Sequence, residues 1–129
     1  MENSIRVIKE FSIQGVIVAN TTVKRPELKS KHRFENGGLS GKPLQKRSTE
    51  MIRNVFQKLG TEMPIIGVGG IFSGADAYDK IRAGASAVQI YTALIYEGPG
   101  QVRKVKRELA KLLNEDGFTS VSDAVGVDS

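Results

Sequence analysis

The sequence predicts an α/β fold organised around a parallel sheet. Three short runs at 15–19, 64–68 and 86–91 are rich in β-branched residues and apolar on both faces, as buried parallel strands are. Segments with helical periodicity alternate with these runs, in the order that crossover connections between parallel strands require. Helices on one side only would leave an apolar face in water, and both outer strands would be open edges. Two arrangements avoid this: the helices cover both faces of the sheet, or the chain is part of a larger sheet or barrel. We expect the second.

The first elements along the chain are a short helix and the first strand. Ser4 is a suitable N-cap for the helix. The apolar side chains at helical spacing after it are Ile5, Ile8 and Phe11. The run GVIVA at 15–19 then forms the first predicted strand.

A long segment without periodicity, residues 20–41, follows this strand. It contains Pro26, clustered basic residues and a Gly-Gly pair, which favour turns over regular structure. A loop of this length in a compact domain is usually functional. We expect a lid or a binding loop.

Proline and glycine mark the ends of two longer predicted helices. One begins at Pro43 and ends before Gly60. The other begins at Pro99 and ends at Gly117, and the tail after it is expected to form one helical turn. The apolar faces consist of Leu44, Met51, Ile52, Val55 and Leu59 in the first helix and of Val102, Val105, Leu109, Leu112 and Leu113 in the second.

A shorter helix is predicted between the second and third strands. Ser73 is a suitable N-cap, and Asp76 lies three residues later in an arrangement that resembles a capping box. The helix continues to about Ala83 and ends at Gly84. The third strand, 86–91, follows at once.

Two consecutive strand ends have the character of a phosphate site. Gly69 and Gly70 follow the second strand and leave their backbone N–H groups unhindered. The helix capped by Ser73 directs its positively charged N-terminus to the same place. The third strand ends in IYTA at 90–93, and eight-stranded barrels commonly bind phosphate after strands seven and eight. Phosphate binding is the preferred interpretation, and a simple tight turn is the alternative.

Two further segments place polar groups where a ligand could bind. GGLSGKP at 37–43 is glycine-rich, but it is neither a Walker loop nor a GxGxxG motif, and it could equally be a turn that starts the next helix. Asn20, Thr21 and Thr22 end the first strand, where amides and hydroxyls can orient a polar ligand. A local turn stabilised by the asparagine side chain is the alternative there.

Composition limits the partners. The chain has 129 residues, a formal net charge of +5 and no cysteine, which favours an anionic partner and excludes disulfides, zinc–thiolate sites and a thiol nucleophile. Aromatic residues are not interleaved with basic ones, so we do not expect nucleic-acid binding. His32 has no second ligand at useful spacing, so no metal site is predicted. No apolar stretch approaches the ~20 residues of a membrane-spanning helix.

Five long motifs cover most of the chain, namely ANTTVKRP (19–26), GGLSGKPL (37–44), STEMIR (48–53), PIIGVGGIFSGADAYDKIRAGAS (64–86) and VQIYTAL (88–94). They resemble the C-terminal part of dihydroorotate dehydrogenases of the membrane-associated, quinone-reducing class. The resemblance implies a TIM barrel, with residues 1–129 as the C-terminal part of its single FMN-binding domain and the three strands as the sixth to eighth. It implies oxidation of dihydroorotate to orotate in pyrimidine (UMP) synthesis, with ubiquinone as electron acceptor at the mitochondrial inner membrane.

The resemblance also implies site residues. Positions that bind FMN in the family match Ala19, Ser40, Gly41, Gly69, Gly70, Tyr91 and Thr92. The glycine pair, Tyr91 and Thr92 match the segments that hold the FMN phosphate, and Asn20 and Thr21 match residues that hydrogen-bond orotate. Tyr91 also matches an aromatic beside the quinone tunnel, which Pro99 is expected to line. Ala19 stands where many relatives have threonine, so a hydroxyl near the flavin is missing.

Other parts of the family's machinery match nothing in this chain. The catalytic base is a serine in a preceding part of the barrel, and the membrane-associating helices also lie upstream. We therefore expect no catalytic residue in this segment and no activity of the 129 residues alone. Two alternatives to a partial enzyme are a non-catalytic module that binds flavin or phosphate, and an interaction fragment that pairs through its strand edges.

Overall fold

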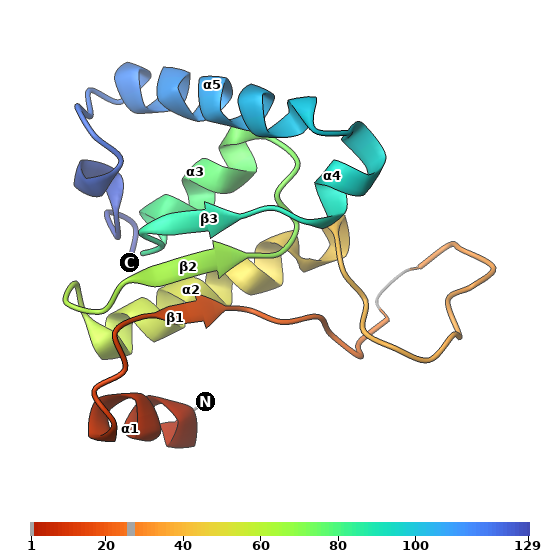
Figure 1. Cartoon of the computed structure of the whole chain (residues 1–129), viewed down its shortest axis with the longest axis horizontal. Helices are drawn as coiled ribbons and strands as arrows, with labels where there is room; N and C mark the ends of the chain where they lie inside the picture. The colour runs from red at the N-terminus through yellow and green to blue at the C-terminus, as the bar shows by residue number, and fades with distance from the viewer. Residues whose placement is uncertain (1, 26–27) are drawn as a thin grey trace.

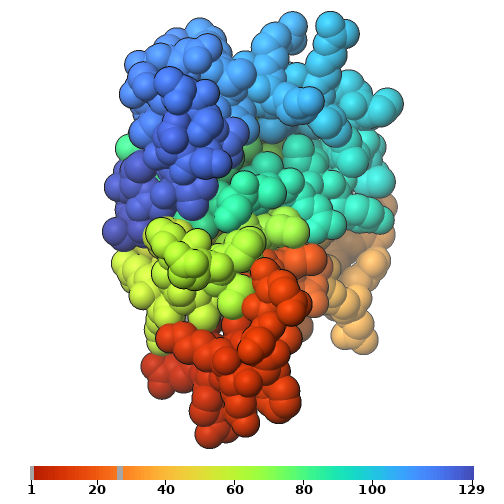
Figure 2. Space-filling view, turned by 60° about the vertical axis from the view of Figure 1, so that its left-hand side comes forward, coloured from red at the N-terminus to blue at the C-terminus, as the bar shows by residue number. Residues whose placement is uncertain are grey.

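The computed structural model of the chain describes residues 2–25 and 28–129, so Pro26 of the predicted loop lies outside the described residues. Three strands, β1 (Val16–Val18), β2 (Ile65–Val68) and β3 (Ala87–Gln89), form a parallel sheet in the order β1-β2-β3. This confirms the predicted parallel α/β fold (Figure 1). The N-terminal helix (Glu2–Glu10) and the last long helix (Gly100–Glu115) lie at opposite ends of the molecule, with the sheet between them (Figures 1 and 2).

Five α-helices and two 3₁₀ turns complete the described chain. The helices are α1 (Glu2–Glu10), α2 (Gln45–Leu59), α3 (Gly74–Arg82), α4 (Thr92–Glu97) and α5 (Gly100–Glu115). The 3₁₀ turns are Lys42–Leu44 and Ser122–Ala124, and the second is the helical turn expected in the tail. The N-cap of α3 is Ser73, whose Oγ accepts a hydrogen bond from the Asp76 N–H at 3.1 Å, as predicted.

Several boundaries differ from the prediction. Helix α1 begins at Glu2, so Ser4 lies inside the helix and is not its N-cap, and Phe11 lies beyond its end and is exposed. Glu2 accepts a hydrogen bond from Lys58 of α2 at 3.1 Å, so the first turn, which the sequence left unassigned, contacts α2. The predicted strand 86–91 ends at Gln89, and α4 was not predicted at all.

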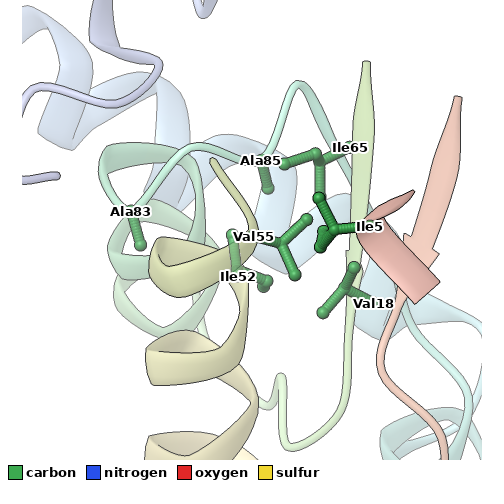
Figure 3. Close-up of a cluster of buried hydrophobic side chains, with 7 residues drawn as sticks. All are labelled: Ile5, Val18, Ile52, Val55, Ile65, Ala83 and Ala85. Carbon is green, nitrogen blue, oxygen red and sulfur yellow. The ribbon is translucent and has the colours of Figure 1, made fainter. Parts of the chain in front are cut away.

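One apolar cluster joins the sheet to α2 and α1. Its buried members are Ile5, Val18, Ile52, Val55, Ile65, Ala83 and Ala85 (Figure 3). Ile52 and Ile65 are completely buried, so β2 packs directly against α2. A second cluster between α3 and α5 contains Tyr78, Ile81, Leu113 and Ala124, whereas Val102, which was predicted on the apolar face of α5, is exposed.

The opposite face of the sheet is not covered by the described residues. Register pairs Ile17 of β1 with Ile66 of β2, and Ile66 with Ala87 of β3, so these three side chains form one row across the sheet. All three residues are exposed, with Ile17 63% accessible. Helices therefore cover one face only, which is the arrangement expected for part of a larger sheet or barrel.

The segment between β1 and α2 extends away from the sheet (Figure 1). Thr22 and Leu39 join its two ends through a pair of backbone hydrogen bonds of 3.1 and 2.7 Å. Arg25 donates from its guanidinium to the carbonyls of Thr22, Glu35 and Gly37 and so closes the base of the loop. The predicted long loop is confirmed for its described residues.

Candidate functional site

The carboxyl ends of the three strands meet in one pocket of about 150 Å³. The residues expected to bind cofactor or substrate all line this pocket, that is Ala19, Asn20, Thr21, Ser40, Gly41, Gly69, Gly70, Tyr91 and Thr92. Thr22 and Pro99, which the sequence also suggested, are not among its lining residues. Pockets that enclose a whole small-molecule ligand are usually about 300–1,000 Å³. The described pocket is therefore large enough for a phosphate and for part of a bigger ligand.

The turn after β2 is built so that only glycine fits. Gly69 and Gly70 have φ angles of 112° and 73°, in the left-handed region that side chains disfavour. A Cβ added to Gly70 would lie 2.5 Å from the backbone nitrogen of Gln45, which begins α2. The turn is thus held against the start of α2 with no room for a side chain.

This turn also carries free hydrogen-bond donors. The N–H groups of Gly70 and Ile71 donate to no acceptor within the described part of the chain. Both residues line the pocket. Two adjacent backbone donors without partners form an arrangement that binds anionic oxygens.

The N-terminus of α3 is less available than the sequence suggested. The Phe72 N–H donates to the Asp76 carboxylate at 2.9 Å, and the Gly74 N–H donates to the Glu108 carboxylate at 2.7 Å. Two carboxylates of the chain itself therefore occupy this helix end. The structure moves the candidate anion site from the helix terminus to the glycine turn before it.

Asp76 is held as a carboxylate. It is 4% exposed, and burial alone would raise its pKa. The Lys42 ammonium, which lies 3.0 Å from both carboxylate oxygens, and the N–H of Phe72 outweigh burial and lower the pKa below its ordinary value. Lys42 is thus engaged with Asp76 beside the pocket.

The end of the long loop reaches the start of α4. The Thr92 hydroxyl donates to the Ser40 Oγ at 3.1 Å. Gly41 has a φ of 83°, and a Cβ there would lie 3.0 Å from the Thr92 methyl group. The glycine therefore allows the loop to approach the third strand end, and together the two segments form one wall of the pocket.

The first strand end contributes Asn20 and Thr21. The Asn20 Oδ1 accepts a hydrogen bond from the Thr21 N–H at 2.7 Å. This bond joins adjacent residues, whereas the Asx-type turn considered as the alternative bonds the backbone two residues on, so it is not that turn. No described residue bonds the Asn20 side-chain nitrogen. A Cβ added to Gly38 would lie 2.0 Å from the Thr21 Oγ1, so the loop passes close to Thr21. The local bond uses the Asn20 oxygen and leaves its side-chain nitrogen available to a ligand.

Sequence reasoning missed several residues of the site. Gln89 of β3 lines the pocket, and its signal was a polar residue within an apolar strand. Ser48 of α2 supports the turn from behind, because its hydroxyl donates to the Gly69 carbonyl at 2.9 Å. Nothing in the local pattern of α2 distinguished Ser48 from a surface serine.

The described residues contain neither a cluster of metal ligands nor a helix that could span a membrane. Among residues 2–25 and 28–129, no three His, Cys, Asp or Glu side chains gather as a metal site. His32 contacts Glu35 at 2.6 Å on the exposed loop. Within the same ranges, no helix has both the length and the apolar character needed to cross a bilayer.

A ligand pocket at the carboxyl ends of parallel strands defines the chain as part of an α/β protein of the barrel or doubly wound type. The family model of dihydroorotate dehydrogenase matches residues 1–113. The chain therefore belongs to the dihydroorotate dehydrogenase family.

Curated relatives and solved structures agree with this family. Dihydroorotate dehydrogenase (quinone) of Xanthobacter autotrophicus is 57% identical over 90% of this chain and 33% of its own length. The mouse protein, named dihydroorotate dehydrogenase (quinone), mitochondrial, is 54% identical over 98% of this chain and 32% of its own length. Ligand-free dihydroorotate dehydrogenase from Eimeria tenella superimposes with a TM-score of 0.94 at 46% identity, over 98% of this chain and 35% of that one. The chain spans about a third of the length of these relatives.

Proposed function

We propose that residues 1–129 are the C-terminal three βα units, strands six to eight, of a TIM-barrel dihydroorotate dehydrogenase. The uncovered row of Ile17, Ile66 and Ala87 supports this placement, since such a row faces the interior when a barrel closes. The two open edges of the sheet would pair with the remaining strands. The matched share of about a third of each relative agrees with three units of eight.

The segment supplies the phosphate part of an FMN site. The observation that carries this proposal is the glycine turn, whose two N–H groups have no acceptor among the described residues, in a pocket that the residues expected to bind FMN line. Gly70 and Ile71 hold phosphate oxygens, and Tyr91 and Thr92 close the site from the third strand. Ser40, Gly41 and Ala19 lie beside the flavin, and Asn20 and Thr21 orient the orotate ring through amide and hydroxyl groups.

The proposed reaction is the oxidation of dihydroorotate to orotate in pyrimidine synthesis, with ubiquinone as the final electron acceptor. Bound FMN supplies the hydride acceptor. This segment fixes the cofactor and part of the substrate, while the general base comes from another part of the barrel. The 129 residues alone are therefore inactive.

The proposed location is the mitochondrial inner membrane, with attachment through helices outside this segment. The mouse relative is named mitochondrial, which supports this location. Relatives from Xanthobacter and Halobacterium also match, at 57% identity over 90% of the chain and 47% over 98% of it, so the location depends on the host cell.

A second candidate is a non-catalytic module that binds flavin or phosphate, or an interaction fragment. The exposed apolar row on the sheet favours the interaction fragment, because it requires a partner surface.

The proposal is tested with the purified chain and two ligands. We expect the chain to retain FMN through gel filtration and to retain less riboflavin, which lacks the phosphate. We also expect no dihydroorotate oxidation. Equal retention of both ligands would contradict a phosphate clamp, and turnover by the chain would contradict the missing base. A further outcome concerns a barrel completed with the remaining strands. If that barrel retains FMN but does not oxidise dihydroorotate, the non-catalytic module is favoured.

A further inference from the structure

Lys80 of α3 is completely buried behind the candidate phosphate turn. Its relative exposure is 0%, and its Nζ donates to the Ser48 Oγ at 2.6 Å, the Thr49 Oγ1 at 2.9 Å and the Gln45 carbonyl at 3.2 Å. All three acceptors are uncharged and belong to the first turns of α2. An ammonium group has three protons, so this site satisfies the protonated lysine fully.

Ser48 connects Lys80 to the glycine turn. Its hydroxyl lies 2.6 Å from the Lys80 Nζ and 2.9 Å from the Gly69 carbonyl. Because the ammonium can only donate, the hydroxyl proton of Ser48 is free to be donated to a carbonyl. The Gly69 carbonyl is one acceptor, and the Gln45 carbonyl at 3.1 Å is the other.

The direction of the Gly69 carbonyl decides the direction of the next N–H group. In a trans peptide, the carbonyl of one residue and the N–H of the following residue point in opposite directions. The peptide between Gly69 and Gly70 is trans. Holding the Gly69 carbonyl on Ser48 therefore directs the Gly70 N–H to the side of the peptide opposite Ser48, and Gly70 lines the pocket.

Loss of the Lys80 proton changes this chain of hydrogen bonds. A neutral amine has a lone pair that can accept from the Ser48 hydroxyl. The Ser48 proton would then leave the Gly69 carbonyl, and the peptide would lose the bond that orients it. Three charged groups lie near Lys80. Asp76 and Asp79 on α3 favour its protonated form, whereas Lys42, which precedes α2, disfavours that form.

We propose that Lys80 is a positioning residue of the phosphate site, which acts through Ser48 on the Gly69–Gly70 peptide and weakens phosphate binding when it loses its proton. This inference rests on the proposed function for its ligand, while the coupling itself is a property of the chain. Burial lowers the pKa of Lys80 to about 8, so the change falls in an accessible pH range.

The coupling is measured by carbon-13 NMR on the purified, labelled 129-residue chain. The shift of the Lys80 Cε reports the proton on the lysine, and the shift of the Gly69 carbonyl reports its hydrogen bond. We expect both to titrate with one midpoint, well below the ordinary lysine pKa of about 10.4. In Ser48→Ala, the Lys80 Cε should still titrate while the Gly69 carbonyl should not. The carbonyl of Gly98, which has no atom near its Cβ position, serves as the unaffected reference.

Ligand binding is measured separately, with FMN as the probe. Its affinity should fall roughly tenfold between about pH 7 and about pH 9.5 in the unmodified chain, and this fall should be absent in Ser48→Ala. A Gly69 carbonyl that stays constant while Lys80 titrates would overturn the inference, and so would a Lys80 that keeps an ordinary pKa. Absence of FMN binding at every pH, with both carbon shifts titrating together, would overturn the proposed function and leave the coupling supported.

Discussion

At the scale of single residues, the site depends on places where a side chain is absent. Gly70 has a positive φ of 73°, and a Cβ added to it would lie 2.5 Å from the backbone nitrogen of Gln45. Gly98, after α4, has almost the same φ of 74° but no atom within 4 Å of its Cβ position. A substitution at Gly98 therefore tests the backbone strain alone, whereas the same substitution at Gly70 tests the strain together with the steric clash.

Replacing Gly70 by alanine should move the turn away from Gln45, because the nearest atoms are the backbone nitrogen and Cα of Gln45. Backbone atoms cannot move aside as the end of a flexible side chain does. We expect Gly70→Ala to lose at least about tenfold in FMN affinity and to be destabilised by roughly 2 kcal/mol. Fluorescence titration with FMN and urea unfolding measure the two effects. Gly98→Ala should show only the backbone strain, of about 1 kcal/mol, and should keep its FMN affinity. Equal loss of affinity in both variants would contradict the role of the turn.

At the scale of elements, the start of α3 is stabilised by the chain's own charges. Asp76 is buried at that helix end and accepts hydrogen bonds from Lys42 and from the Phe72 N–H. Carboxylates are favourable near helix N-termini. The arrangement explains why the glycine turn, and not the helix end, presents free donors.

The lowered pKa of Asp76 predicts how stability depends on pH. A carboxyl whose folded pKa lies below its unfolded value stabilises the fold above the unfolded value of about 3.9 and loses this contribution as pH falls through the folded value. We expect Asp76→Asn to lower the free energy of unfolding by about 1–2 kcal/mol at neutral pH. Below about pH 5, the free energy of unfolding of the variant should decrease less steeply than that of the unmodified chain. Urea unfolding across this range measures both. An unchanged acid limb in Asp76→Asn would show that other carboxylates dominate.

Local patterns predicted most elements but not their tertiary partners. The three strands, Ser73 as the N-cap of α3 and the C-terminal turn were visible because burial and capping act over a few residues. Helix α4 was missed because its apolar residues continue directly from β3, and a short apolar run does not distinguish strand from helix. The support of the turn by Ser48 and Lys80 joins residues 32 positions apart, which no local pattern reveals.

For the molecule as a whole, the main feature is a sheet face that the described helices leave exposed. One face of the sheet exposes Ile17 and Ile66, while the other is packed against helices. The chain also spans about a third of the relatives it matches. The apolar face and the open edges are where the remaining units of a barrel would pack.

The isolated chain should therefore associate with itself through this face. We expect a concentration-dependent increase in sedimentation coefficient, because a contiguous apolar face and unpaired strand edges promote contact between copies. Ile17→Lys should reduce this association severalfold. Val23→Lys is the matched control, since Val23 is 84% exposed but lies on the loop. Association that both variants reduce equally would indicate a general effect of charge.

A chimera gives the most direct test of the phosphate clamp that we propose for this segment. Residues 1–129 replace the matching third of the mouse relative, which is 54% identical to them, and bound FMN is measured after purification. We expect a folded chimera that binds FMN and oxidises dihydroorotate, and a Gly70→Ala chimera that folds but loses FMN while Gly98→Ala keeps it. A folded chimera whose FMN content is the same with and without Gly70→Ala would contradict the proposed phosphate site.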